Sequence, residues 1–395
     1  MGTRSLTDLR GVWGVYLYES RLVKTRGRFF DAGEPKGEIE PMLFVEGTIM
    51  ERLRGSLMVG AATWVVLLSL VCQAALGRDA TKLAIRPQKV SAEAGKYSLL
   101  PPQASLIDGD AVPWYEKAAK TLPDKKSDDQ IRQWLKMPID QLPADQVEQT
   151  LTQYVESFKG VAKAIKCRDC NWPAWKPGTQ VANAEEYHRL ALGIRLWARL
   201  ELSRGEYEGA VLAMQTGFGM ARQFGQAPAL AQLQFGVAIA GTSCREIEEL
   251  VQMEGSPNLY SALAGFPKPF ADVEKAIESE KKAASSPGLL GRLASRQSES
   301  VMKPAYDAMR AFVKRLDRDL AALQCIEAIR AYAASHGGQL PQTLAEITDV
   351  SVPKDPASGA AFRYSRTGTT AVLESPAPPG GEKREELRYE ITVKN

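Results

Sequence analysis

Histidine is scarce in this chain, whose 395 residues contain only His188 and His336. Because histidine is the usual general base and the commonest metal ligand, this scarcity argues against a histidine-based metal site or a His-dependent catalytic triad. An excess of charge of one sign is also lacking, since 50 basic and 47 acidic residues give a formal net charge of +3. So balanced a charge gives no reason to expect nucleic acid or acidic lipid as a partner.

Wholesale disorder is excluded by the composition. Hydrophobic residues make up 44% of the chain and charged residues 25%, which are ordinary values for a globular protein. The length suffices for one large domain or two smaller ones with a sizeable buried core.

One long run, from Gly55 to Gly77, carries no charge and is rich in Leu, Val and Ala. At about 23 residues it would just span a bilayer. The basic stretch Met50 to Arg54 precedes it, and small residues end it at Gly77, before Arg78. This three-part pattern predicts an exported protein with a signal peptide over 50–77, cleaved between Gly77 and Arg78. Residues 1–49 are then interpreted as an over-extended start or a disordered tail.

A retained single-pass anchor is the alternative for the same run. The residues that follow Gly77 hold four basic side chains, whereas the short stretch before it holds Arg52 and Arg54. This distribution goes against the positive-inside rule for an anchor with an external C-terminus, so cleavage is favoured. The expected location is the periplasm or cell envelope, with membrane contact only through residues 55–77 if they are not cleaved.

The remaining chain divides into three predicted parts. Residues 78–113 are rich in Pro, Gly and small residues and are expected to form an extended lead-in. Residues 114–290 show helical periodicity and are expected to form an α-helical domain. Its helices are expected over 114–122, 128–137, 144–165, 184–224 with a break at 203–207, 229–253 and 270–282. Residues 291–395 are expected to form a long helix and a small β-hairpin module.

The stretch 184–224 resembles one tetratricopeptide unit, a pair of helices that pack through small residues. Five residues fall at the spacing of that family: Trp197, Ala198, Gly205, Tyr207 and Ala210. The chain departs from the family pattern at three positions. Glu201 stands where the family has an aromatic residue, Gly217 where it has alanine and Arg222 where it has proline. The resemblance implies a helical hairpin and a protein or peptide as partner.

The last hundred residues differ in kind from the helical part. A helix ends at Gly337-Gly338, Asp355-Pro356 predicts a rigid turn, and a hairpin is expected to turn at Gly368, with an edge strand over 385–393. This order resembles the back half of type II secretion pseudopilins, and the end of exported bacterial proteins with helical front halves. The resemblance implies a fold module without an activity. Because no pilin-type processing motif precedes the helix, a filament subunit is not expected.

Cys167-Arg168-Asp169-Cys170 is the sharpest chemical signal. Two thiols at this spacing support thioredoxin-type exchange when they open a helix after a strand, but here they follow a long helix and no strand is expected before them. Cleavage at Gly77 would leave four cysteines: Cys167, Cys170, Cys244 and Cys325. Their even number favours structural disulfides, with three possible connectivities. Buried free thiols, a metal site and a redox pair remain the alternatives.

Three glutamates, Glu274, Glu278 and Glu280, alternate with lysines on the helix predicted over 270–282. Paired carboxylates can act as acid and base, but a solvated helix face is the simpler interpretation. We therefore predict a mostly α fold, a tetratricopeptide-like hairpin array followed by a small α+β module, with no catalytic site, cofactor or metal. The expected function is an exported scaffold or protein-interaction protein. The alternatives are a thiol–disulfide protein and an accessory component of a secretion or pilus-like assembly.

Overall fold

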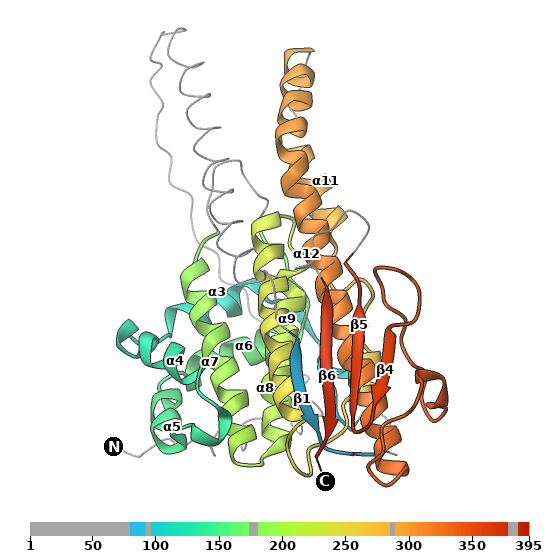
Figure 1. The fold of residues 1–395 in the computed structure, drawn as a ribbon. Coiled ribbons are helices and arrows are strands. Elements are labelled where there is room, and N and C mark those ends of the chain that lie inside the picture. Colours follow the sequence, from blue (N-terminus) through green and yellow to red (C-terminus); the bar gives the residue numbers. More distant parts are fainter. Residues whose placement is uncertain (1–79, 92–95, 174–180, 285–288, 378–385, 395) are drawn as a thin grey trace, which may run out of the picture.

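A computed structural model of the protein describes residues 80–91, 96–173, 181–284, 289–377 and 386–394. This part of the chain is mostly helical, with a four-stranded sheet in the C-terminal region (Figure 1). At this level the fold class expected from the sequence is confirmed. The leader over 50–77 and the cleavage site at Gly77 and Arg78 lie outside the described residues. Within the described ranges no helix is long and apolar enough to cross a membrane.

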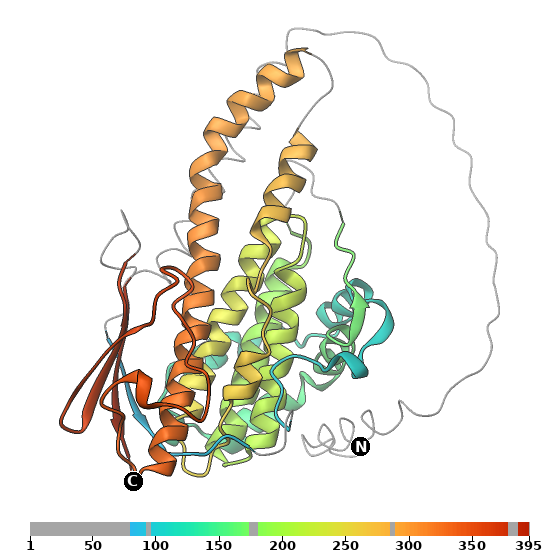
Figure 2. The same ribbon diagram turned by 90° about the vertical axis from the view of Figure 1, so that its right-hand side faces the viewer.

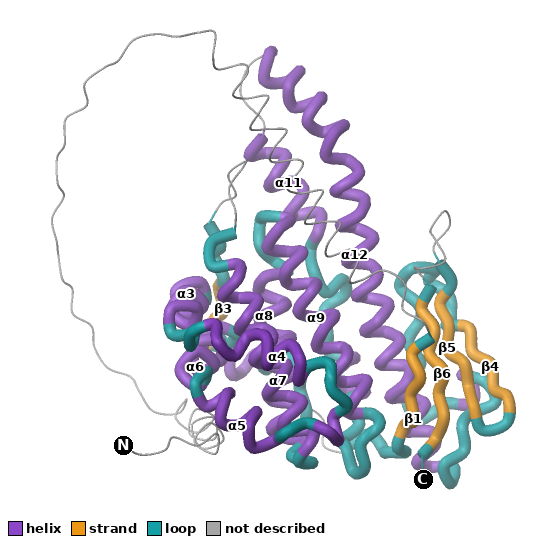
Figure 3. The backbone as a smooth tube through the Cα atoms, turned by 60° about the vertical axis from the view of Figure 1, so that its left-hand side comes forward, coloured by secondary structure: helices purple, strands orange, loops and turns teal. Residues whose placement is uncertain are grey.

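Three long helices form the centre of the molecule: α7 (Ala184–Ser203), α8 (Tyr207–Phe224) and α9 (Leu230–Leu250). They pack side by side. Shorter helices cover one flank of this centre (Figure 3): α3 (Val112–Lys120), α4 (Asp128–Trp134), α5 (Ala144–Thr152) and α6 (Val155–Ala164). On the other side lie α10 (Tyr260–Ala264), α11 (Val273–Ala284) and α12 (Leu289–Ser335).

One predicted helix is divided in the structure. The single helix expected over 144–165 is divided into α5 and α6 around Tyr154. Leu151, Tyr154 and Phe158 are all buried at helical spacing, so the apolar pattern continues across a break that it cannot reveal. The long helix expected from residue 291 is α12, which begins at Leu289 and runs through Pro304.

The four-stranded sheet has the order β1-β6-β5-β4. Its strands are β1 (Thr81–Ile85), β4 (Arg363–Thr367), β5 (Thr370–Ser375) and β6 (Leu387–Val393). The expected hairpin is confirmed: β4 and β5 pair antiparallel across Gly368, whose φ of 61° suits glycine. The edge strand expected at the end of the chain was wrong, because β6 lies inside the sheet between β1 and β5.

Strand β1 comes from the lead-in that was expected to be extended and loop-like. It pairs in parallel with β6, more than three hundred residues later in the chain. Leu83 and Ile85 alternate with exposed or half-buried neighbours and point into the core. The local sequence pattern cannot predict which strand pairs with β1. One hydrophobic cluster includes residues of β1, of the helices and of the sheet. The domain boundary at residue 290 stays a prediction.

The expected Asp355-Pro356 turn is anchored on α12. Asp355 is buried and accepts hydrogen bonds from Ala357 N and from the hydroxyls of Ser358 and Ser375. Arg318 of α12 donates to Ser375 Oγ and lies 3.7 Å from the Asp355 carboxylate. Such a satisfied buried network fixes the loop against the helix.

Helix α11 and residues 289–316 of α12 form a pair that we call the arm, and its far end projects beyond the other helices (Figure 2). Arg310 of α12 binds Glu274 of α11 through two nitrogens, at 2.7 and 2.8 Å. Lys281, at the other end of α11, lies over the ring of Tyr306. The two helices of the arm are therefore antiparallel.

Candidate functional site

The four candidate cysteines lie at three separate places in the fold. Cys167 begins the short strand β3 (Cys167–Asp169), which pairs in parallel with β2 (Ile107–Asp110), and Cys170 follows it. Cys244 lies in α9 and Cys325 in α12, and none of the four forms a disulfide within the described residues. Burial raises the pKa of Cys167 and of Cys170, and raises that of Cys325 to about 12. Thiols that stay protonated are poor nucleophiles.

Strand β3 replaces the loop that was expected to begin at Cys167. A β-strand rises about 3.3 Å per residue, so three extended steps would separate the Cα atoms of Cys167 and Cys170 by about 10 Å. Disulfides need Cα atoms within about 7 Å of each other. The local backbone therefore works against a bond between these two, and the structural disulfides stay a prediction.

The two histidines lie far apart in the fold. His188 of α7 is exposed and lies edge-on to Phe235, and desolvation lowers its pKa. His336 stacks on Tyr332 at the end of α12. No group of three or more His, Cys, Asp or Glu side chains within the described residues is placed to hold a metal ion.

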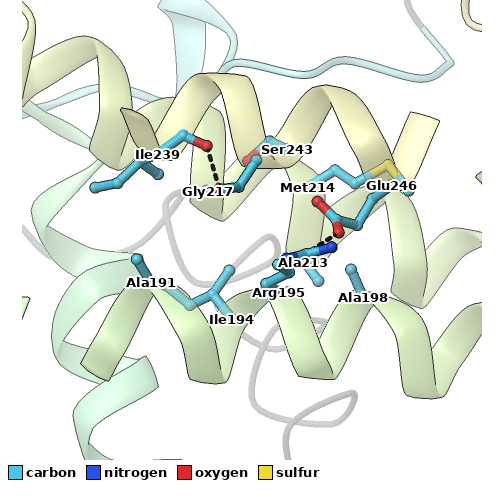
Figure 4. Close-up of a pocket in the computed structure, with 11 residues that line it drawn as sticks. Ala191, Ile194, Arg195, Ala198, Ala213, Met214, Gly217, Ile239, Ser243 and Glu246 are labelled. Atoms are coloured by element: carbon cyan, nitrogen blue, oxygen red, sulfur yellow. Dashed lines mark hydrogen bonds and ion pairs between the residues drawn. The ribbon is translucent and has the colours of Figure 1, made fainter. Parts of the chain in front are cut away.

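A depression lies where α7, α8 and α9 meet (Figure 4). The space enclosed in it is about 10 Å³, room for about one water molecule. Sites for drug-sized ligands usually measure roughly 300–1,000 Å³, so the depression is too small for a metabolite. Its floor and walls are mainly apolar or small, and its polar groups are Arg195, Thr242, Ser243 and Glu246.

Arg195 and Glu246 form an ion pair in this depression, between α7 and α9 (Figure 4). Arg195 Nε donates to Glu246 Oε1 at 2.6 Å, and the two side chains are 14% and 2% exposed. Burial raises the pKa of Glu246 to about 7, although the guanidinium lowers it. The terminal nitrogens of Arg195 have no hydrogen-bond partner within the described part of the chain. Because a guanidinium has five donors, Arg195 can still bind a second carboxylate.

The other two arginines of α7 have their donors engaged inside the protein. Arg189 binds Asp128 at 2.8 Å and donates to the carbonyls of Pro123 and Asp124. Arg199 binds Glu249 at 2.9 Å and donates to two carbonyls in and just beyond α4. Both tie the flanking helices to the centre, which leaves Arg195 as the arginine of α7 that lines the depression.

Gly217 sets the distance between α8 and α9 at the depression. A Cβ atom at this position would lie 2.8 Å from Ser243 Oγ, so the missing side chain lets the two helices approach. Sequence reasoning noted Gly217 only as a departure from the tetratricopeptide pattern, and it did not single out Arg195 or Glu246. These two lie 51 residues apart, and neither stands in a motif that marks it.

In comparisons with protein-family models, curated proteins and solved structures, nothing matches this chain. The tetratricopeptide and pseudopilin resemblances therefore rest on the residues that carry them and stay predictions.

Proposed function

We propose that the protein is an exported helical scaffold that binds a protein partner at the α7–α9 depression. The observation that carries this proposal is Arg195, whose terminal donors are open while its Nε holds Glu246. In this proposal a carboxylate of the partner binds those terminal donors.

The packing of α7 and α8 supports a tetratricopeptide-like interpretation of this centre. Gly205 joins the two helices with a φ of 70°, and Ala198 and Ala210 are buried. Trp197 is buried as well and stacks on Phe158 of α6. These are the roles that the spacing assigned to them: a glycine that turns the chain, small residues between helices and an aromatic that fills a gap.

Photo-crosslinking in the native host tests the proposal. A photoreactive phenylalanine analogue at Thr242, on the rim of the depression, is expected to give a covalent adduct with a protein partner. The same analogue at Lys82, an exposed residue on β1, serves as the control and is expected to give none.

The substitution Arg195→Gln is then added to the Thr242 probe. If the guanidinium holds a partner carboxylate, the adduct is expected to fall by about tenfold, the effect of losing a charge-assisted hydrogen bond of about 1.5 kcal/mol. An adduct of equal yield with and without Arg195, or no adduct at all, would contradict the proposal.

Export is the second part of the proposal, and it is supported by the charge-free run and its flanks. N-terminal sequencing of the protein from its native host is expected to find Arg78 first. A first residue upstream of Gly55 would instead favour a retained anchor.

The two alternative functions have weaker support. A thiol–disulfide activity needs an accessible low-pKa cysteine, whereas burial raises the pKa of both Cys167 and Cys170. A role as an accessory component of a secretion or pilus-like assembly is supported by the C-terminal resemblance alone. Pull-down from the envelope without any component of such an assembly would count against it.

A further inference from the structure

Glu280 differs from the other two glutamates of α11. Glu274 and Glu278 are exposed, as the solvated-face interpretation expected, but Glu280 is only 2% exposed. For this residue the interpretation was wrong, because α11 turns Glu280 toward the first turn of α9. There its Oε1 accepts the Leu230 N–H at 2.8 Å, and no cation of the described residues lies within 4 Å of it.

A carboxylate in such a place favours its neutral form. Burial penalises the charge, and only the Leu230 N–H at the α9 N-terminus compensates, so the pKa of Glu280 rises to about 7. Protonation keeps the hydrogen bond, because the carbonyl oxygen of the acid still accepts from Leu230. Ionisation leaves a buried charge with a single donor, which is costly.

The charged and titratable side chains near Glu280 come from α7, α11 and α12. α9 has no titratable residue from Leu230 to Ser243. On α12, Arg310 lowers the pKa of Glu274, and Lys303 together with Arg310 lowers that of Asp307. Asp317 of α12 accepts the Phe270 N–H just before α11, and burial raises its pKa. Lys281 of α11 lies over Tyr306. His188 of α7 faces Phe235 of α9, and desolvation lowers its pKa.

Few side chains of α11 are buried, although Lys281 contacts Tyr306 of α12. The start of this segment is fixed because Asp317 accepts the Phe270 N–H. Farther along, the buried side chains of α11 are Ala276, Ile277 and Glu280. The ionisation state of Glu280 therefore acts on a helix with few other buried contacts.

We propose that Glu280 is a proton-operated latch on the arm: the neutral acid holds the second half of α11 against α9, and the carboxylate releases it. Since the pKa in the docked state lies above the usual value of 4.5, docking is strongest at low pH and is lost as pH rises through about 7. The shift corresponds to a change on the order of 100-fold in the docking equilibrium between pH 5 and pH 8.

Hydrogen exchange of the whole protein tests the latch. After correction for intrinsic rates, protection of the α11 amides is expected to fall by roughly 100-fold from pH 5 to pH 8, while that of α8 stays constant. In Glu280→Gln, whose amide oxygen can still accept from Leu230 N, protection of α11 is expected to be high and independent of pH. Glu278→Gln, an exposed position on the same helix, is the control and is expected to behave like the unmodified protein.

Carbon NMR titration of the glutamate carboxyl groups gives an independent measurement, with Glu280→Gln used for assignment. A titration of Glu280 near pH 7 is expected. Protection that does not change with pH, a change that persists in Glu280→Gln and so belongs to another group, or a Glu280 titration near 4.5 would each overturn the proposal.

Discussion

Two regions of the molecule each bury a glutamate against α9. In the body, Glu246 of α9 faces α7, and in the arm, Glu280 of α11 faces the α9 N-terminus. Burial raises the pKa of both to about 7. The difference lies in the partner, since Glu246 touches a guanidinium and Glu280 touches one backbone N–H.

That difference decides which protonation state the structure needs. In the body, a proton on Glu246 would leave Arg195 without its partner carboxylate, so the packing depends on a charge. In the arm, the packing depends on the loss of a charge. Both glutamates are buried to a similar extent. Buried Glu246 stabilises the body as part of an ion pair, whereas buried Glu280 makes the packing of the arm depend on pH.

Breaking the ion pair of the body is expected to have the largest effect. Arg195→Met leaves Glu246 buried and unpaired, and we expect a loss of about 3 kcal/mol in the free energy of unfolding at pH 8. The loss is expected to be smaller at pH 5, where Glu246 can take up a proton. Urea unfolding measures both. The matched control is Arg310→Met in the arm, whose ion pair with Glu274 is exposed and should be worth less than about 1 kcal/mol. Equal losses of stability in Arg195→Met and Arg310→Met would contradict the difference proposed between the two regions.

Removing the charge of the arm is expected to act in the opposite direction. Glu280→Gln should raise the free energy of unfolding by about 1–2 kcal/mol at pH 8 and by much less at pH 5. The sign follows because a carboxyl group whose folded pKa is raised destabilises the fold as pH rises from about 4.5 to 7. The measurement is urea unfolding at the two pH values. A loss of stability at pH 8 would show that the carboxylate form is the one that packs.

Two glycines of α9 offer a further test of how tightly this shared helix is packed. A Cβ at Gly236 would lie 2.5 Å from Gly225 N, whereas nothing lies within 4 Å at Gly241. Gly236→Ala is therefore expected to cost about 1–3 kcal/mol through overpacking, and Gly241→Ala to gain up to about 1 kcal/mol through helix propensity. Thermal unfolding compares the two, and a stabilising Gly236→Ala would contradict the close approach of α8 and α9.

Local patterns in the sequence were sufficient for much of the fold. The break at 203–207, the helix end at Gly337-Gly338 and the turn at Gly368 were predicted because glycines with positive φ mark them directly. Helix periodicity located α7, α8 and α9 to within a few residues. The division between α5 and α6 at Tyr154 was not predicted, because Tyr154 is buried and continues the helical spacing of apolar residues.

The candidate site and the latch could not be predicted in the same way. Arg195 and Glu246, or Glu280 and Leu230, meet only when helices about fifty residues apart pack together. Glu280 shares its sequence surroundings with Glu274 and Glu278, so composition assigned all three to solvent. What distinguishes them is the side of α11 on which each lies: Glu280 faces the protein, and Glu274 and Glu278 face solvent.

The parallel pairing of β1 with β6 has a consequence for how the chain is made. The first strand of the sheet is synthesised more than three hundred residues before its partner. Throughout elongation, Leu83 and Ile85 therefore have no strand to cover them, and the sheet closes only as the last residues emerge. Such a late, non-local step is slow and leaves an unpaired edge in the meantime. A chain that stops short of Leu387 would carry a complete set of helices and still be unable to finish its sheet.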